Sequence, residues 1–217
     1  MLVDLSHEIA AGLVTYPGLP APAVTDFLSR EASEARYAPG VTFHIARIDM
    51  VANTGTYLDA PFHRFAGGAD LAGLALARLA DLEGLLIDAT GRAGRAIDAD
   101  AFAGRDLGGK AVLVRTGWDA HWATPHYADG HPFLTRRSVE HLAAAGPALV
   151  GIDSLNIDDT ADPTRPAHSV LLGAGIPVVE HLCGLGRLPA AGFRFHCVPV
   201  KFRGVGTFPV RAYAVVA

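Results

Sequence analysis

The fold class follows from the apolar segment KAVLVRTGW at residues 110–118, whose apolar and β-branched residues predict a strand. Two further predicted strands stand on either side of it, GLLIDAT at 84–90 and PALVGID at 147–153. The helical segment RRSVEHLAAAG, residues 136–146, precedes the last of these strands, and Thr135 can act as its N-cap. Strands that alternate with helices in this way predict an α/β domain.

Consecutive strands are predicted towards both ends of the chain. The segment VTFHIARIDMV (41–51) alternates, and FRFHCVPVKF (193–202) and FPVRAYAVV (208–216) follow one another near the C-terminus. A helix or helix–turn is predicted for LAGLALARLADLEG (71–84). Because no linker or repeat interrupts the sequence, we expect a single α/β domain over residues 1–217, with a mixed sheet and an extra β layer.

The composition restricts the classes of protein to which the chain can belong. Half of its 217 residues are hydrophobic and its net charge is −4, so there is no basic face for a nucleic acid. Two cysteines do not make a disulfide framework. The N-terminus lacks the features of a signal peptide, and no apolar run is long enough to span a membrane. We therefore expect a cytoplasmic protein that binds a small-molecule substrate.

The segment NTGTYLDAPFHRF (53–65) is the first candidate for chemistry. Asp59 and His63 are four residues apart, but Pro61 lies between them and disfavours a helix. The spacing therefore differs from the helical face of an HExxH metalloprotease, and we expect a bend that aims both side chains at one cavity. The alternative is a polar turn with one stray histidine, and the spacing alone leaves both interpretations open.

A second candidate lies in PAHSVLLGAGIPVVEHL, where His168 and Glu180 are twelve residues apart across a short predicted helix. Together with Asp59 they would form a set of one imidazole and two carboxylates. Such a set can hold Zn²⁺ or Mn²⁺ and leave a position open for water. The spacing alone does not decide whether these residues meet.

A third candidate is the aromatic and histidine-rich loop WDAHWATPHYADGHPFL after residue 117. Its histidines match no compact metal-ligand motif. We favour an aromatic wall for a flat substrate, formed by Trp118, Trp122 and Phe133. A packed surface loop is an equally good interpretation of the same residues.

The chain as a whole resembles the cyclase and kynurenine-formamidase-like family of metal-dependent hydrolases, which includes isatin hydrolases. The quoted segment at 53–65 corresponds to the family signature HxGTHxDxPxHF. Other segments resemble further family blocks in the same order: VDLSHEI, TYPG, VLVRTGW, GIDSLNID, AHSVLLGAGIPVVEHLCGL and VPVKFRGVGTFPVRAYAV. The resemblance implies a swivelling β/β/α-type fold, a homodimer or higher homo-oligomer, and a divalent metal near the signature.

The resemblance also implies roles for individual residues. It makes Asp59, His168 and Glu180 metal ligands, and it makes His63 the residue that handles protons. Two family histidines are replaced, by Asn53 and by Tyr57. An amide oxygen is a weak donor, and a phenol has an ordinary pKa near 10, so a two-metal centre is disfavoured. A single ion, with Asn53 as a further weak ligand, and a metal-free site in which Tyr57 donates a hydrogen bond both remain open.

The function expected from this resemblance is hydrolysis of a small amide or lactam, as in an arylformamidase of the kynurenine pathway. A bound Zn²⁺ or Mn²⁺ would activate water, and His63 would act as general acid and base, with Asp59 and Tyr57 beside it. Thr56 would shape the pocket or steady the oxyanion. The alternatives are a metal-independent cyclase, dehydratase or isomerase on the same fold, and a non-catalytic small-molecule binding protein.

Overall fold

The computed structural model describes residues 1–217, and its main element is one mixed sheet of nine strands in the order β1-β13-β11-β5-β7-β9-β10-β4-β12. The strands β5, β7, β9 and β10 run parallel, and antiparallel strands extend the sheet on both sides. The α/β class with a mixed sheet is therefore confirmed. The strands are β1 Leu2–Asp4, β4 Tyr57–Asp59, β5 Leu82–Asp88, β7 Ala111–Arg115, β9 Leu149–Ile152, β10 Val178–Glu180, β11 Ala191–His196, β12 Thr207–Pro209 and β13 Tyr213–Val216.

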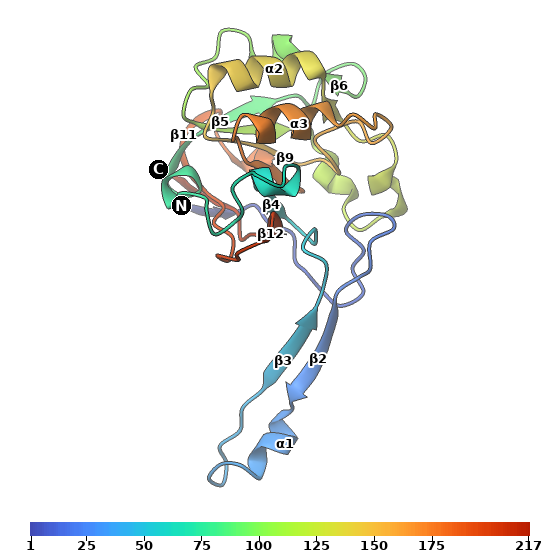
Figure 1. Cartoon of the computed structure of the whole chain (residues 1–217), viewed down its shortest axis with the longest axis vertical. Helices are drawn as coiled ribbons and strands as arrows, with labels where there is room; N and C mark the ends of the chain where they lie inside the picture. The colour runs from blue at the N-terminus through green and yellow to red at the C-terminus, as the bar shows by residue number, and fades with distance from the viewer.

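One face of the sheet is covered by the helices α2, Arg136–Ala145, and α3, Pro166–Gly173 (Figure 1). As predicted, the Thr135 side chain caps α2 by accepting a hydrogen bond from the Ser138 N–H. A short pair of strands, β6 Ala96–Ile97 and β8 Phe133–Leu134, and the 3₁₀ turn η3, Ala99–Phe102, extend this layer. The core beneath it is formed by fully buried aliphatic side chains from β7 and β9 and from both helices.

The opposite face is covered because the sheet curls on itself. The chain beyond β1 returns to the end of β10, where the Cys183 N–H donates to the Leu5 carbonyl at 3.0 Å and Ser6 forms a bridge with Leu182. This closure encloses a second core in which Phe193 and Phe195 are almost fully buried. A sheet buried on both faces explains why its central strands are apolar throughout.

A helix or helix–turn was predicted for residues 71–84, and no α-helix forms there. The structure has only the 3₁₀ turn η2, Leu76–Arg78, before β5 begins at Leu82. The N–H groups of Leu71 and Ala72 donate instead to carbonyls of the 202–205 loop. Backbone donors engaged outside the segment are not available for helical hydrogen bonds, so this tertiary contact overrides the helical propensity.

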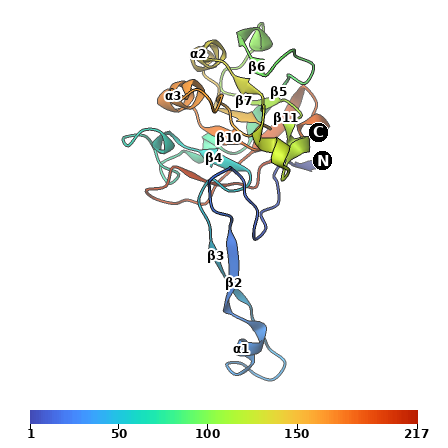
Figure 2. The same ribbon diagram turned by 90° about the vertical axis from the view of Figure 1, so that its right-hand side faces the viewer.

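A long hairpin arm projects from the body of the molecule (Figures 1 and 2). It comprises residues 23–49, with the antiparallel strands β2, Ala23–Leu28, and β3, Ile45–Asp49, and the short helix α1, Arg30–Glu34, near its tip. All residues of the two strands except Leu28 are exposed. Neither this arm nor the body contains a helix long and apolar enough to span a membrane.

Candidate active site

The strand β4 carries the signature segment into the sheet, and its register brings distant residues together. Glu180 on β10 pairs with Tyr57, and Thr207 on β12 pairs with Asp59 on the opposite side of the strand. Residue 60 then adopts an extended conformation before the 3₁₀ turn η1, Pro61–His63, as the proline requires. The bend expected from the sequence is therefore present, and it returns His63 towards Asp59.

A hydrogen-bonded chain links Asp59, Thr207 and His63. The Thr207 hydroxyl donates its proton to Asp59 Oδ1 and lies 2.8 Å from His63 Nδ1. Because the hydroxyl has one proton and has already donated it, it accepts from His63 Nδ1–H. In the neutral ring Nε2 is then the nitrogen without a proton, and it is free to bind an ion or to accept a proton from water.

A second carboxylate orients His168, which lies on α3. Asp158 Oδ2 accepts from His168 Nδ1 at 2.6 Å, and the two Asp158 oxygens also accept the backbone N–H groups of Ala167 and His168. His168 Nε2 is consequently directed to a gap between two carboxylates, 3.6 Å from Asp59 Oδ2 and 3.7 Å from Glu180 Oε1. Burial opposes the charged form of His168, but Glu180, Asp158 and Asp59 together raise its pKa well above its usual value.

The side chains at this gap fit a divalent ion. Asp59 Oδ2 is buried without any hydrogen-bond partner, which is costly for a carboxylate unless a cation faces it. Ligand atoms of Asp59, His63 and His168 lie within 4.8 Å of one another. One carboxylate and two imidazoles suit Zn²⁺ and other first-row divalent ions, and the hydrogen bond from His168 to Asp158 is the outer support that metal-bound histidines usually have.

The structure brings the three expected ligands Asp59, His168 and Glu180 to one gap. Glu180 was expected as a third ligand; its Oε1 lies 3.7 Å from His168 Nε2, and its oxygens accept hydrogen bonds at 2.7 Å from the Ile157 N–H and from the Tyr57 hydroxyl. His63, expected to handle protons, is the residue that completes the donor cluster. Asn53 lies on the cavity wall and hydrogen-bonds to Tyr57, and it is not part of that cluster.

Tyr57 lies behind this cluster as a buried donor. Burial and the charges of Glu180 and Asp59 raise the pKa of its phenol well above the ordinary value, so the hydroxyl keeps its proton. Burial raises the pKa of Glu180 to about 7 and lowers that of His181 to about 3. His181 is thus neutral between the hydroxyls of Tyr127 and Tyr57, at 2.9 and 3.3 Å.

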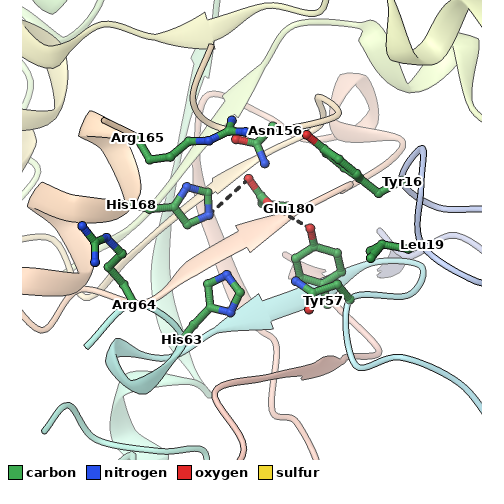
Figure 3. A pocket seen from close by; sticks show the side chains of 10 residues that line it. Tyr16, Leu19, Tyr57, His63, Arg64, Asn156, Arg165, His168 and Glu180 are labelled. Atoms are coloured by element: carbon green, nitrogen blue, oxygen red, sulfur yellow. Dashed lines mark hydrogen bonds and ion pairs between the residues drawn. The ribbon is translucent and has the colours of Figure 1, made fainter. Parts of the chain in front are cut away.

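A cavity of about 350 Å³ opens onto these side chains (Figure 3). Its lining combines the predicted residues Asn53, Tyr57, His63, His168 and Glu180 with residues that were not predicted, namely Tyr16, Leu19, Arg64, Asn156 and Arg165. The sequence offered no motif for the second group, because these residues come from irregular segments and from the ends of elements.

The expected aromatic wall does not line this cavity. Trp122 lines a separate cavity with Tyr127, Trp118 donates its indole N–H to the Tyr127 carbonyl, and Phe133 packs under Arg95. Trp118 lies on the 3₁₀ turn η4, Trp118–His121, Trp122 follows it, and the turn η5, Pro125–Ala128, comes next. Thr56 is also outside the cavity, because its buried hydroxyl donates to the His181 carbonyl and accepts the His7 N–H.

Two residues with positioning roles, Asp158 and Thr207, were also missing from the sequence analysis. Asp158 ends the quoted segment GIDSLNID, in the loop that follows the strand β9, where polar residues beyond a strand end could have suggested a site. Thr207 stands in VGTFPV and has no such signal. Only the register between β12 and β4 places its hydroxyl between Asp59 and His63.

Comparisons with known proteins identify the family and the fold of the chain. The putative cyclase family matches residues 3–159. Kynurenine formamidase of Maricaulis maris is 27% identical over 96% of this chain and 95% of its own, and that of Paracidovorax citrulli is 29% identical over 98% and 95%. A solved structure described as a potential metal-dependent hydrolase with cyclase activity has a TM-score of 0.81, at 27% identity over 99% and 96% of the two chains.

The fold is also that of isatin hydrolase A from Labrenzia aggregata, which superimposes with a TM-score of 0.85 over 100% of this chain and 93% of that one, at 22% identity. The swivelling fold expected from the resemblance is thus confirmed. The match to the putative cyclase family covers well over half of the sequence. The chain therefore belongs to the putative cyclase family, and it is a hydrolase.

Proposed function

We propose that the chain hydrolyses a C–N bond in a small amide or lactam, with one divalent ion held by Asp59, His63 and His168. The observation that carries the proposal is the buried, unpartnered Asp59 Oδ2, which lies 3.6 Å from Nε2 of the cavity-lining His168. The kynurenine formamidases among the relatives support an amide substrate, because their name denotes hydrolysis of a formamide.

The ion would supply a water of lowered pKa and would polarise the carbonyl. The residues of the chain orient the ligand atoms before the ion binds. Asp158 holds the His168 ring with Nδ1 as the donor, and Thr207 does the same for His63, so that both Nε2 atoms are available. The Tyr57 hydroxyl holds Glu180 in place at the cavity wall, where both residues can contact a substrate.

A single ion, rather than two, is proposed because of Tyr57 and Asn53. A second ion would need anionic or imidazole ligands beside Glu180. At that position the structure has a protonated phenol, which donates to Glu180 Oε2 and is itself hydrogen-bonded to the Asn53 amide. A protonated phenol and an amide are weaker ligands than the two imidazoles of the family signature, and this disfavours a second ion.

The test is metal analysis of the purified chain, combined with hydrolysis of N-formylkynurenine and formanilide before and after chelation. We expect one Zn²⁺ or Mn²⁺ per chain, and activity that is lost with a chelator and restored by the ion. The variant Asn53→His/Tyr57→His is expected to raise the metal content above one. A chain that retains full activity in chelator contradicts the proposal, and so does one that binds two ions without substitution.

The role of His63 is decided by the metal content of His63→Gln. We expect this variant to lose most of its bound ion, as a ligand should, whereas the exposed His141→Gln keeps it. If His63→Gln retains a full ion but does not turn over substrate, then His63 is the proton carrier that the sequence analysis predicted, and the ion has another third ligand.

A metal-independent enzyme on the same fold is the second candidate, and the Tyr57–Glu180 pair favours it. A buried phenol that donates to a carboxylate of raised pKa could serve as a proton donor without an ion. This candidate predicts that turnover persists in chelator and that Tyr57→Phe is severely impaired. The metal proposal predicts the opposite response to the chelator.

A further inference from the structure

A buried histidine that does not line the cavity contacts the candidate active site from outside it. His181 follows the strand β10, and its side chain is fully buried. Its Nε2 atom lies 3.3 Å from the Tyr57 hydroxyl, and its Nδ1 atom lies 2.9 Å from the Tyr127 hydroxyl. Tyr57 in turn donates to Glu180 on the cavity wall (Figure 3). Four side chains thus form one chain of hydrogen bonds that ends at the cavity.

The backbone of His181 is strained where it brings the ring to this position. Its φ of 55° lies in the left-handed region, which is costly for a residue other than glycine. In an extended strand, neighbouring side chains point to opposite faces, yet Glu180 and His181 both contact the Tyr57 hydroxyl. The left-handed conformation breaks that alternation, and the buried Thr56 hydroxyl supports it by donating to the His181 carbonyl. Strain that the structure maintains beside an active site indicates that the position of this ring has a function.

Only one arrangement of protons satisfies the three contacts of this chain. Burial lowers the pKa of His181 to about 3, so the neutral ring has a single N–H group. An ionised Glu180 can only accept, so the Tyr57 hydroxyl gives its proton to Glu180 and its oxygen accepts from His181. The ring proton is therefore on Nε2, and Nδ1 accepts the proton of the Tyr127 hydroxyl.

The Tyr127 hydroxyl excludes the alternative arrangement. If Nδ1 of His181 carried the ring proton, Nε2 would be a free acceptor and would compete with Glu180 for the proton of Tyr57. The Tyr127 hydroxyl forms no hydrogen bond except the one to Nδ1, so its proton occupies that position and keeps the ring proton on Nε2. The direction of the Tyr57 hydroxyl thus depends on a tyrosine that lines the separate cavity beside Trp122 and not the cavity of the candidate site.

The aromatic loop after residue 117 holds the His181 ring from its other sides. Trp122 packs against this ring at a steep angle, with 5.6 Å between the ring centroids, and stacks flat on His7 at 3.9 Å. The rings of Trp122 and Tyr127 are 5.2 Å apart and nearly perpendicular. The loop that was expected to line the substrate cavity therefore contacts the site through His181 instead.

We propose that Tyr127 and His181 are positioning residues for the candidate active site. The Tyr127 hydroxyl fixes the tautomer of His181 in which Nε2 carries the proton. This tautomer directs the hydroxyl of Tyr57 to Glu180, where both residues line the cavity. The hydrogen-bond arrangement is independent of the reaction, and only its effect on turnover rests on the proposed hydrolysis.

The first test is the tautomer of His181, measured from the ring ¹⁵N chemical shifts of protein labelled at histidine. The signal is assigned by its absence from His181→Asn, because asparagine tolerates a left-handed backbone. We expect wild-type His181 to be protonated at Nε2, and we expect Tyr127→Phe to move much of that proton to Nδ1. The matched control is Tyr213→Phe, whose ring stacks on His196 without a hydrogen bond to it and which should leave the His181 signal unchanged. Wild-type protonation at Nδ1, or an unchanged tautomer in Tyr127→Phe, overturns the inference.

The second test is a double-mutant cycle on kcat/KM for N-formylkynurenine or formanilide. Loss of the Tyr127 hydroxyl should lower kcat/KM about 2–10-fold, the range for one neutral hydrogen bond. In the Tyr57→Phe background, Tyr127→Phe should have no further effect, because Tyr127 acts through Tyr57. Equal decreases in the two backgrounds show a structural role only and overturn the positioning role. If neither amide is hydrolysed, that result counts against the hydrolase proposal, and the tautomer measurement still decides this inference.

Discussion

The substitution Asp158→Asn tests how Asp158 orients His168, because it leaves the histidine in place and changes only its hydrogen-bond partner. In the wild-type protein the Asp158 carboxylate can only accept hydrogen bonds, so His168 Nδ1 carries the proton and Nε2 faces Asp59. In the variant the amide has a single acceptor oxygen for the three N–H groups that the carboxylate accepts, so at least one of them loses its partner. The His168 ring then loses the charge-assisted hydrogen bond that fixes Nδ1 as the donor and directs Nε2 to Asp59, and ion binding weakens.

The expected size of the effect follows from these contacts. Loss of an outer partner of a metal-bound histidine typically weakens ion binding about 10–100-fold, or roughly 1.4–2.7 kcal/mol. The free energy of unfolding of the metal-free protein should fall by only about 1–2 kcal/mol, because one charge-assisted hydrogen bond becomes a neutral one. The variant should therefore fold but bind the ion poorly.

The assay is a Zn²⁺ titration against a competing chromogenic chelator, together with thermal unfolding of the metal-free protein. Asp159→Asn is the matched control, because Asp159 is the next residue and contacts only the Ala161 N–H and Arg95. If Asp158→Asn is folded and its Zn²⁺ affinity lies within threefold of the wild-type value, then Asp158 does not set the tautomer of His168 and the reasoning is refuted.

Four further predictions follow from single contacts. The ion displaces the proton of His168, so ion affinity should increase about tenfold per pH unit while the pH is below the raised pKa of His168. An ion affinity that does not change between pH 6 and 7.5 contradicts this prediction. Burial raises the pKa of Asp153 to about 6, so the folded state holds a proton that the unfolded state loses near pH 4. The stability that this proton contributes is complete below pH 4 and lost as the pH rises through 6, by about 3 kcal/mol; Asp153→Asn should flatten the stability profile across this window. In Gly206→Ala the new Cβ would lie 2.4 Å from the His63 N atom, so we expect activity to fall at least tenfold through displacement of His63, and a variant with normal kcat/KM would refute this placement. In Gly84→Ala the Cβ would lie 1.9 Å from the Phe193 ring in the neighbouring strand. Chemical denaturation should then show a loss of about 1–3 kcal/mol, and a loss below 0.5 kcal/mol would contradict the tight packing.

Part of the fold and of the site could be predicted from local patterns. The apolar run at 110–118 becomes β7, and Thr135 caps α2, because burial of a strand and capping of a helix depend on residues close in sequence. The proline in DAPFH bends the chain after Asp59, as expected from its effect on the preceding residue. The family resemblance added His168 and Glu180, which local patterns alone did not connect to Asp59.

The tertiary structure decided which of these side chains share a site. The hydroxyl of Thr207 reaches Asp59 and His63 because β12 pairs with β4, 148 residues apart along the chain. Trp118 and Trp122 were expected at the cavity, but Trp118 hydrogen-bonds to the Tyr127 carbonyl, Trp122 lines another cavity, and Arg165 and Asn156 are on the wall instead. Propensity and spacing act over a few residues, whereas hydrogen-bond partners, burial and pKa depend on the register of distant strands. For that reason the sequence by itself determined the α/β class and the chemical groups available, and only the folded chain decided that Glu180 binds Tyr57 while His63 joins Asp59 and His168.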